Sequence, residues 1–168
     1  QIKDKIGDGK KENAKIKYLQ EDIPLGTIGS VSKISKFEHD YVLVTNSDIL
    51  TNLDYEQFFL DFIDSKADFS VATIPYNINV PYAILETTNK RITSFKEKPT
   101  YTFFANAGIY LMKKEIVNEI PRNQYYNATD LLDYLIKHDF NVRSFPLRGY
   151  WLDIGKHDDY NKAQEDIN

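Results

Sequence analysis

The run Tyr41-Val42-Leu43-Val44-Thr45, followed at once by Asn46-Ser47-Asp48, is the stretch of sequence that decides the fold class. Its five residues are aromatic, aliphatic or β-branched without alternation, which is typical of a strand buried on both faces. The next three residues are common turn formers. The segment therefore predicts an interior strand of a layered α/β sheet, with a loop at the carboxyl end of that strand.

Helical and strand patterns alternate on both sides of this run. Apolar or small residues recur at helical spacing between residues 27 and 37, and Tyr55–Ala67 has an apolar face and precedes a strand pattern at Phe69–Tyr76. We also expect strands at Lys15–Leu19, Tyr82–Glu86, Arg91–Lys96, Ala107–Met112 and Val142–Pro146, and helices at Glu115–Glu119, at Thr129–His138 with Thr129 as N-cap, and at Asp158–Ile167.

This order of elements predicts an α/β fold, a three-layer sandwich with a mostly parallel mixed sheet. The 168 residues suit a single domain spanning residues 1–168. A β-rich stretch interrupts the alternation in the middle of the chain. The architecture places ligands at the carboxyl ends of the strands, where loops converge.

Composition excludes several classes of function. No apolar run approaches the roughly 20 residues of a membrane helix, so we expect no membrane segment. The 21 basic and 25 acidic residues give a net charge of −4, which makes nucleic acid an improbable partner. The chain has no Cys, which excludes disulfides, thiolate metal sites and Cys nucleophiles and fits a cytoplasmic location.

Two acids stand at the ends of apolar segments. Asp48 follows the strand at 41–45, and Asp153 lies within Trp151-Leu152-Asp153-Ile154-Gly155. Carboxylates at rigid element ends suit Mg²⁺, which takes oxygen ligands and shares them with substrate phosphates. Asp48 alone is better explained as a turn residue, but a second such acid favours a shared metal.

Three shorter motifs allow a functional or a plain structural interpretation. Glu97-Lys98-Pro99 could contact sugar hydroxyls and a phosphate, because Pro99 is expected to hold Lys98 extended, but by itself the motif is better explained as a solvated ion pair. Asn106-Ala107-Gly108 allows close backbone approach by a ligand, or simply begins a strand. Pro24-Leu25-Gly26-Thr27 places a glycine near a helix start. Backbone N–H groups there can bind a ligand, but an ordinary helix cap would explain the motif as well.

In their order along the chain, these pieces resemble the sugar-1-phosphate nucleotidylyltransferases, in particular the hexose-1-phosphate guanylyltransferase-like branch. The resemblance runs over nearly the whole chain and rests on DIPLGTIGS, VLVTNSDIL, VPYAIL, FKEKP, NAGIYLM and GYWLDIGKHDDY. It implies a nucleotide-diphospho-sugar transferase-like, Rossmann-like fold. It also implies transfer of a nucleoside monophosphate from GTP to a hexose 1-phosphate such as mannose 1-phosphate, with Mg²⁺ and release of pyrophosphate.

The resemblance also implies roles for individual residues. Asp48 and Asp153 would bind the metal and, with Lys98, serve catalysis. The nucleobase would be contacted by Leu25 and Gly26, and the sugar hydroxyls and sugar phosphate by Glu97 and Lys98. The sugar pocket would be lined by Tyr82, Ala83, Asn106 and Gly108. Direct attack on phosphorus needs positioning and charge neutralisation more than a protein nucleophile, which agrees with the absence of a Ser or Cys nucleophile motif.

The sequence departs from the family in two ways. Ala83 stands where members commonly have Gly, and the N-terminal loop of the form G-G-x-G-T-R-L is absent. We therefore expect an N-terminally truncated catalytic domain that is weakly active or inactive alone. An incomplete sheet would expose a strand edge, so a homo-oligomer is expected, and branch members often carry CBS domains upstream.

Two other functions remain open from the sequence. Asn46-Ser47-Asp48 after a strand is similar to the acidic metal motif of nucleotide-sugar-dependent glycosyltransferases, with one acid replaced. A non-catalytic module that binds a sugar phosphate or nucleotide is the third interpretation.

Overall fold

The computed structural model describes residues 2–167, except for the side chains of Glu12 and Ile167. It contains helices, short 3-10 helices (η) and strands with the following bounds: α1 Ile2–Ile6, η1 Lys10–Glu12, η2 Gly29–Lys33, β1 Tyr41–Thr45, β2 Ile49–Thr51, α2 Tyr55–Asp64, β3 Phe69–Asn79, β4 Ile84–Thr88, β5 Arg91–Lys96, β6 Thr100–Lys113, η3 Lys114–Glu119, α3 Ala128–Lys137, β7 Val142–Pro146, β8 Trp151–Asp153 and α4 His157–Ile167.

The central sheet has the strand order β1-β6-β3-β7. Strand β6 is antiparallel to both β1 and β3, and β3 is parallel to β7. Strands β1, β3 and β7 therefore share one direction, with β6 reversed between them. The expected mixed α/β sheet is confirmed, although β3 with β7 is the one parallel pairing among its strands in residues 2–167.

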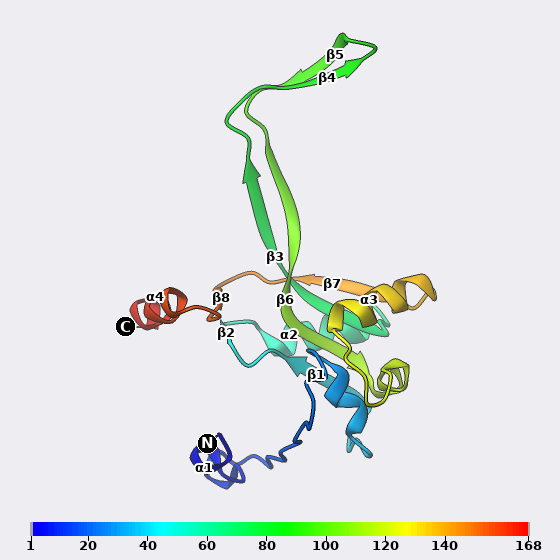
Figure 1. Ribbon diagram of the computed structural model, residues 1–168, viewed down its shortest axis with the longest axis vertical. Helices are drawn as coiled ribbons and strands as arrows, with labels where there is room; N and C mark the ends of the chain where they lie inside the picture. Colours follow the sequence, from blue (N-terminus) through cyan, green and yellow to red (C-terminus); the bar gives the residue numbers. More distant parts are fainter. Residues whose placement is uncertain (1, 168) are drawn as a thin grey trace.

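Two hydrophobic cores lie on the two faces of this sheet. One face packs against η2, η3 and α3, and the other packs against α2 (Figure 1). Successive residues of a strand point to opposite faces, so Tyr110 and Met112 of β6 enter the first core, whereas Ile109 and Leu111 enter the second. The arrangement is the predicted three-layer sandwich.

Beyond the sheet, β3 and β6 continue as a two-stranded arm, defined as residues 74–105. The arm carries the β4–β5 hairpin at its far end and projects away from the body (Figure 1). One of its faces is polar, where Thr102 donates a hydrogen bond to Asn77 and Thr100 donates one to Asn79, both at 2.8 Å. The arm is the β-rich interruption that the sequence predicts.

Several predicted elements differ from the structure. Residues 27–37 form only the five-residue η2, and η3 replaces the expected α-helix at 115–119, because both are short connections whose turns close within three residues. No strand forms at Lys15–Leu19. Helix α2 ends at Asp64, before Lys66 takes a positive φ of 53°.

The N-terminus of α3 also differs from the prediction. Asn127, not Thr129, is its N-cap, and the backbone N–H of Asn127 donates to the Asp130 carboxylate at 2.8 Å. Asn127 and Asp130 thus form a capping box, which satisfies backbone donors at the helix end. The sequence Asn-x-x-Asp carries the same signal as a capping box, two residues before the position predicted for the N-cap, Thr129.

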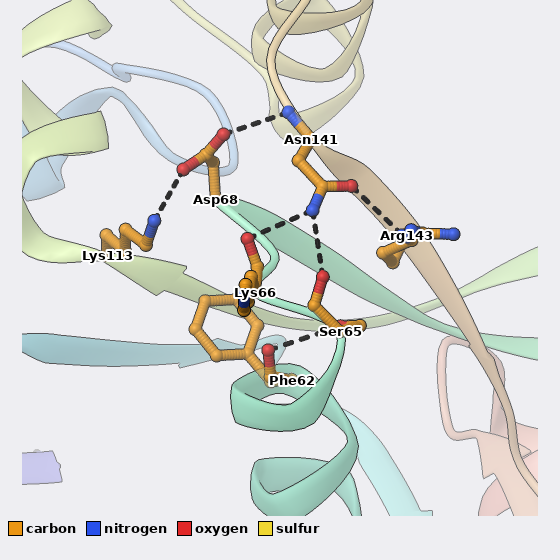
Figure 2. Close-up of polar contacts among 7 residues, drawn as sticks. All are labelled: Phe62, Ser65, Lys66, Asp68, Lys113, Asn141 and Arg143. Carbon is orange, nitrogen blue, oxygen red and sulfur yellow. Dashed lines mark hydrogen bonds and ion pairs between the residues drawn. The ribbon is translucent and has the colours of Figure 1, made fainter.

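A polar network fixes the amino end of β3 (Figure 2). The Asp68 carboxylate accepts hydrogen bonds from the Lys113 ammonium at 2.7 Å and from the Asn141 backbone N–H at 2.9 Å. The Asn141 side chain donates in turn to the carbonyls of Ser65 and Lys66. One carboxylate thus joins the starts of β3 and β7 to the end of β6, next to the end of α2.

We expect acid to weaken this network. Burial of the Asp68 carboxyl favours its neutral form, but the bonds from Lys113 and Asn141 outweigh burial and hold the pKa of Asp68 below its ordinary value. A lowered folded pKa stabilises the protein above the unfolded pKa, about 3.9, and the contribution is lost as pH falls through the folded pKa. Urea unfolding should therefore show that Asp68→Asn is most destabilising near neutral pH and progressively less so below about pH 4.

The exposed Asp64→Asn serves as the matched control and should show no such pH dependence. An equal destabilisation by Asp68→Asn at neutral and acidic pH would contradict the role of the ionised carboxylate.

Candidate active site

Strands β2 and β8 form a short antiparallel pair that brings two distant acids together. Ile49 lies opposite Asp153, and the Ile154 N–H donates to the Asp48 carbonyl at 2.7 Å. The backbones of Asp48 and Asp153 therefore lie at the same end of this ladder, although the paired residues Ile49 and Asp153 are 104 positions apart in the sequence. Both side chains are exposed.

A bulge in β6 lies against the start of the loop that carries Asp48. Val71 of β3 pairs with Tyr110 and Thr73 pairs with Asn106, so Ala72 alone lies opposite residues 107–109. At the bulge, Gly108 has a φ of 73° and its N–H donates to the Asn106 side chain at 2.8 Å. A glycine suits this left-handed conformation because other residues are strained there.

Two further hydrogen bonds hold the bulge against its neighbours. The Asn46 N–H donates to the Gly108 carbonyl at 2.9 Å, and the Trp151 indole N–H donates to the Ala107 carbonyl at 2.9 Å. Asn46 precedes Asp48 in the loop, and Trp151 precedes Asp153 in β8. We call Asp48, Asp153 and the bulge Asn106–Gly108 the carboxylate site, since these bonds link them.

The two carboxylates suit a hard cation that is shared with a ligand. Within residues 2–167, neither the Asp48 nor the Asp153 side chain makes a hydrogen bond or an ion pair, and no cluster of three or more His, Cys, Asp and Glu could hold a metal. Magnesium usually takes one or two carboxylates and completes its shell with water and substrate phosphates. The donor set fits that pattern, and it does not fit a metal enclosed by protein ligands alone.

Asn106 connects the bulge to a buried phenol. Its side-chain amide donates to the Tyr110 hydroxyl at 2.8 Å. Burial raises the pKa of Tyr110, and the Asn106 bond opposes that shift. The Asn106 side chain is therefore oriented from both ends, with its oxygen on Gly108 and its nitrogen on Tyr110.

Leu25 and Gly26 lie elsewhere, against the start of α3. The Leu25 side chain is only 1% exposed and belongs to the interior, while the Leu25 carbonyl accepts a bond from the Tyr126 N–H at 2.9 Å. At Gly26, φ is 77°, and a Cβ would lie 2.6 Å from the Tyr126 carbonyl oxygen. The loop is thus closely packed on residues 126–127, and its contact with a nucleobase stays a prediction.

The arm carries the remaining predicted residues. Tyr82, Ala83, Glu97 and Lys98 are exposed beside the β4–β5 hairpin, at the end of the arm away from the sheet (Figure 1). The structure therefore does not bring them to the carboxylate site. The predicted extended backbone at Lys98 is wrong: its φ is 43°, because the chain turns there to bring the Pro99 carbonyl to the Val80 N–H at 3.0 Å.

Sequence reasoning missed the parts of Asn46 and Trp151 that hold the site together. In the sequence both residues stand out only as neighbours of an acid, because their hydrogen-bond partners Gly108 and Ala107 lie far away along the chain. The strands β2 and β8 were missed as well, since three residues give too short a pattern. The available signal was that one motif contains the single Trp of the sequence, Trp151, and another contains a small residue, Ala107, that a large ring can approach closely.

Across residues 2–167, no helix combines the length and the apolar character needed to cross a bilayer.

The comparisons with known proteins all match the chain to nucleotidyltransferases. The family model described as Nucleotidyl transferase matches residues 1–168. The D-glycero-alpha-D-manno-heptose 1-phosphate guanylyltransferase of Aneurinibacillus thermoaerophilus is 31% identical over 90% of this chain and 67% of its own length. A glucose-1-phosphate adenylyltransferase of Bacillus thuringiensis is 28% identical over 75% of this chain and 37% of its own length.

A solved structure shares the fold. HddC from Yersinia pseudotuberculosis, crystallised in complex with GMP-PN, is 26% identical and superposes with a TM-score of 0.70 over 99% of this chain and 73% of its own chain. The chain thus spans about two thirds of the guanylyltransferase and just over a third of the adenylyltransferase.

Proposed function

Because the chain belongs to the nucleotidyl transferase family, we propose that it takes part in joining a sugar 1-phosphate to a nucleoside triphosphate. A phosphate oxygen of the sugar attacks the α-phosphorus, the bond from that phosphorus to the β-phosphate oxygen breaks, and pyrophosphate leaves. The observation that supports the proposal is the pairing of β2 with β8, which brings the backbones of Asp48 and Asp153 to the same end of one short ladder. Two anions that meet at phosphorus repel, so the reaction needs positioning and charge neutralisation.

In this proposal Asp48 and Asp153 hold Mg²⁺ between the protein and the phosphates. The cation would neutralise phosphate oxygens and act as a Lewis acid. The two exposed carboxylates would contribute the oxygen donors, since Asp153 ends β8 and Asp48 directly precedes β2. That ladder is held to the rest of the sheet by the Trp151 bond to Ala107.

The substrate contacts form a second part of the proposal. Asn106 and Gly108 would line the sugar pocket with the backbone and side chain of the bulge, which packs against Asn46 and Ile49 on its other side. Glu97 and Lys98 would bind sugar hydroxyls and the sugar phosphate, and Tyr82 and Ala83 would line the sugar pocket. These four residues stand on the arm, so their assignment requires the arm to bend toward the carboxylate site.

Guanosine is our preferred base and a hexose or heptose 1-phosphate our preferred sugar, such as mannose 1-phosphate. The heptose-specific guanylyltransferase relative and the HddC complex with GMP-PN support this choice. The adenylyltransferase relative makes ATP the competing nucleotide. Leu25 and Gly26 are the proposed base contacts.

The test mixes the chain with Mg²⁺, one sugar 1-phosphate and either GTP or ATP, and measures pyrophosphate and nucleotide-sugar. We expect GTP with mannose or heptose 1-phosphate to react at least about tenfold faster than ATP, and chelation of the metal to stop the reaction. Residues 1–168 contain no G-G-x-G-T-R-L loop, so the rate should be low.

Other products would contradict the proposal. Formation of a glycoside from a nucleotide-sugar and an acceptor would favour a glycosyltransferase. Calorimetric binding of sugar 1-phosphate without any pyrophosphate, even at high protein concentration, would favour a non-catalytic binding module.

A further inference from the structure

Asn52 directly follows β2 and extends its pairing with β8 by one more position. The ladder itself pairs three residues of each strand, and the pair at this end joins Thr51 to Trp151. In the same register the next pair is Asn52 with Tyr150. Two hydrogen bonds join this pair: the Asn52 N–H donates to the Tyr150 carbonyl at 3.3 Å, and the Tyr150 N–H donates to the Asn52 side-chain oxygen at 2.7 Å.

The Asn52 side chain takes the place of a backbone carbonyl in this pair. Two hydrogen-bonded residues of an antiparallel ladder normally exchange bonds between their backbones. Here the N–H of Asn52 follows that rule, but the N–H of Tyr150 binds the carboxamide oxygen instead. The Thr51 hydroxyl adds a bond to the Tyr150 carbonyl at 2.8 Å. Side chains of residues 51 and 52 therefore hold the residue that precedes β8.

Gly149 leaves the space that this contact needs. Its φ is 145°, and an added Cβ would lie 2.3 Å from the Asn52 side-chain oxygen. Any larger residue at position 149 would therefore displace the carboxamide from the Tyr150 N–H. The absence of a side chain at 149 and the acceptor at 52 together make the bond possible.

The carboxylate site lies at the opposite end of the same ladder. There the Ile154 N–H donates to the Asp48 carbonyl at 2.7 Å, and Asp153 is paired with Ile49. Three residue steps separate Asn52 from Ile49, which corresponds to about 10 Å along the strand. Strand β8 is thus held at both ends, by Asn52 before its first residue and by Asp48 after its last.

Such a short ladder needs both anchors to keep its register. A two-stranded pair is marginally stable by itself, and β2 and β8 pair only three residues each. Side chains alternate between the two faces of a strand, so a slip by one residue moves each of them to the other face. For Asp153, such a slip would turn the carboxylate away from the face that it occupies in the structure.

We propose that Asn52 is a positioning residue, whose side chain sets the register of β8 and so holds Asp153 at the end of the ladder where Asp48 lies, in place for a metal ion. The inference rests on the proposed function, because that function assigns both carboxylates to Mg²⁺. Asn52 acts through the backbone of Tyr150, about 10 Å along the ladder from Asp153, and is not itself a ligand of the metal.

Two substitutions at position 52 separate the acceptor from the size of the side chain. Asn52→Leu keeps the size and removes the partner of the Tyr150 N–H, whereas Asn52→Asp keeps an oxygen acceptor. The charge added by Asn52→Asp lies about one Debye length from Asp153 at 0.1 M salt, so it is largely screened. Asn77→Leu on the arm is the matched control, because Asn77 is also exposed and its side-chain oxygen also accepts one bond, from Thr102 at 2.8 Å.

Nuclear magnetic resonance measures the register without metal or substrate. Ile49 and Asp153 form a pair without backbone hydrogen bonds between them, in which the two α-carbons approach closely, so their α-protons should give a strong Overhauser contact. We expect Asn52→Leu to lose most of this contact, and Asn52→Asp and Asn77→Leu to keep it. An undiminished contact in Asn52→Leu would overturn the proposal.

Binding of Mn²⁺, followed by electron paramagnetic resonance, measures the effect on the metal. We expect Asn52→Leu to raise the dissociation constant for Mn²⁺ about tenfold and Asn52→Asp to restore the wild-type value. Equal affinities of Asn52→Leu and the wild-type chain would overturn the role of Asn52 toward the metal. Failure of the proposed function would look different: the wild-type chain would bind no Mn²⁺ at all, and the contact between Ile49 and Asp153 would still decide whether Asn52 sets the register.

Discussion

Replacement of Asp153 by Asn, or of Asp48 by Asn, is expected to lower the rate of pyrophosphate release by about 100-fold or more, equivalent to about 2.7 kcal/mol of activation free energy. Each substitution keeps the size of the side chain and removes one negative charge from the carboxylate site. Both side chains are exposed and make no hydrogen bond within residues 2–167, so neither change should lower the free energy of unfolding. The loss should therefore appear in activity alone.

Measurement of Mg²⁺-dependent GTP binding by calorimetry separates the metal from other roles. Both variants should bind GTP with little dependence on Mg²⁺, whereas the wild-type chain should bind it more tightly with the metal. The matched control is Asp158→Asn, which removes an exposed acid five positions beyond Asp153, in the first turn of α4. Wild-type turnover in either variant, or an equal loss in Asp158→Asn, would refute the metal assignment.

Gly108→Ala is expected to destabilise the fold by about 2–4 kcal/mol, the largest stability effect we predict for a single methyl group. Gly108 has a φ of 73°, and an added Cβ would lie 2.7 Å from the side-chain Nδ2 of Asn46 and 2.8 Å from the Ile49 Cδ1 atom. The strained backbone costs about 1–2 kcal/mol, and the displaced neighbours add to it. The displacement would reach Asp48, which lies between Asn46 and Ile49.

Gly7→Ala isolates the effect of the close contacts. Gly7 has nearly the same φ, 70°, but a Cβ there would meet nothing within 4 Å. Urea unfolding should therefore show for Gly7→Ala only the backbone cost of about 1–2 kcal/mol, without the added cost of displaced neighbours. Equal costs for the two variants would mean that the bulge accommodates a side chain without moving Asn46 and Ile49.

Much of the fold followed from local patterns. The bounds of β5 and β7 agree with the sequence prediction residue for residue, and β1 begins and ends where expected. These segments have strong β patterns bounded by turn formers, which decide the backbone state locally. The short 3-10 helices were taken for α-helices because three or four apolar residues at helical spacing do not define how many turns will form.

The candidate site was predicted in part. The sequence identified Asp48, Asp153, Asn106 and Gly108 as separate candidates, and the β2–β8 pairing and the β6 bulge bring them into one region. It could not show that Asn46 and Trp151 hold that region together, because each bond joins residues that lie far apart in the chain. Nor could it place the arm, since the direction of a two-stranded ribbon depends on how β3 and β6 twist as they leave the sheet.

By itself, then, the sequence determined the alternation of strands and helices, the layered fold class and the residue types that suit phosphate chemistry, since all of these follow from short-range patterns. Only the tertiary structure decided that Asp48 and Asp153 lie at the same end of one ladder, that Leu25 is buried, and that Tyr82 and Lys98 stand away from the carboxylate site. These outcomes depend on pairing and packing between distant segments, and the free energy of such contacts is set by the assembled sheet and by no local stretch of the chain.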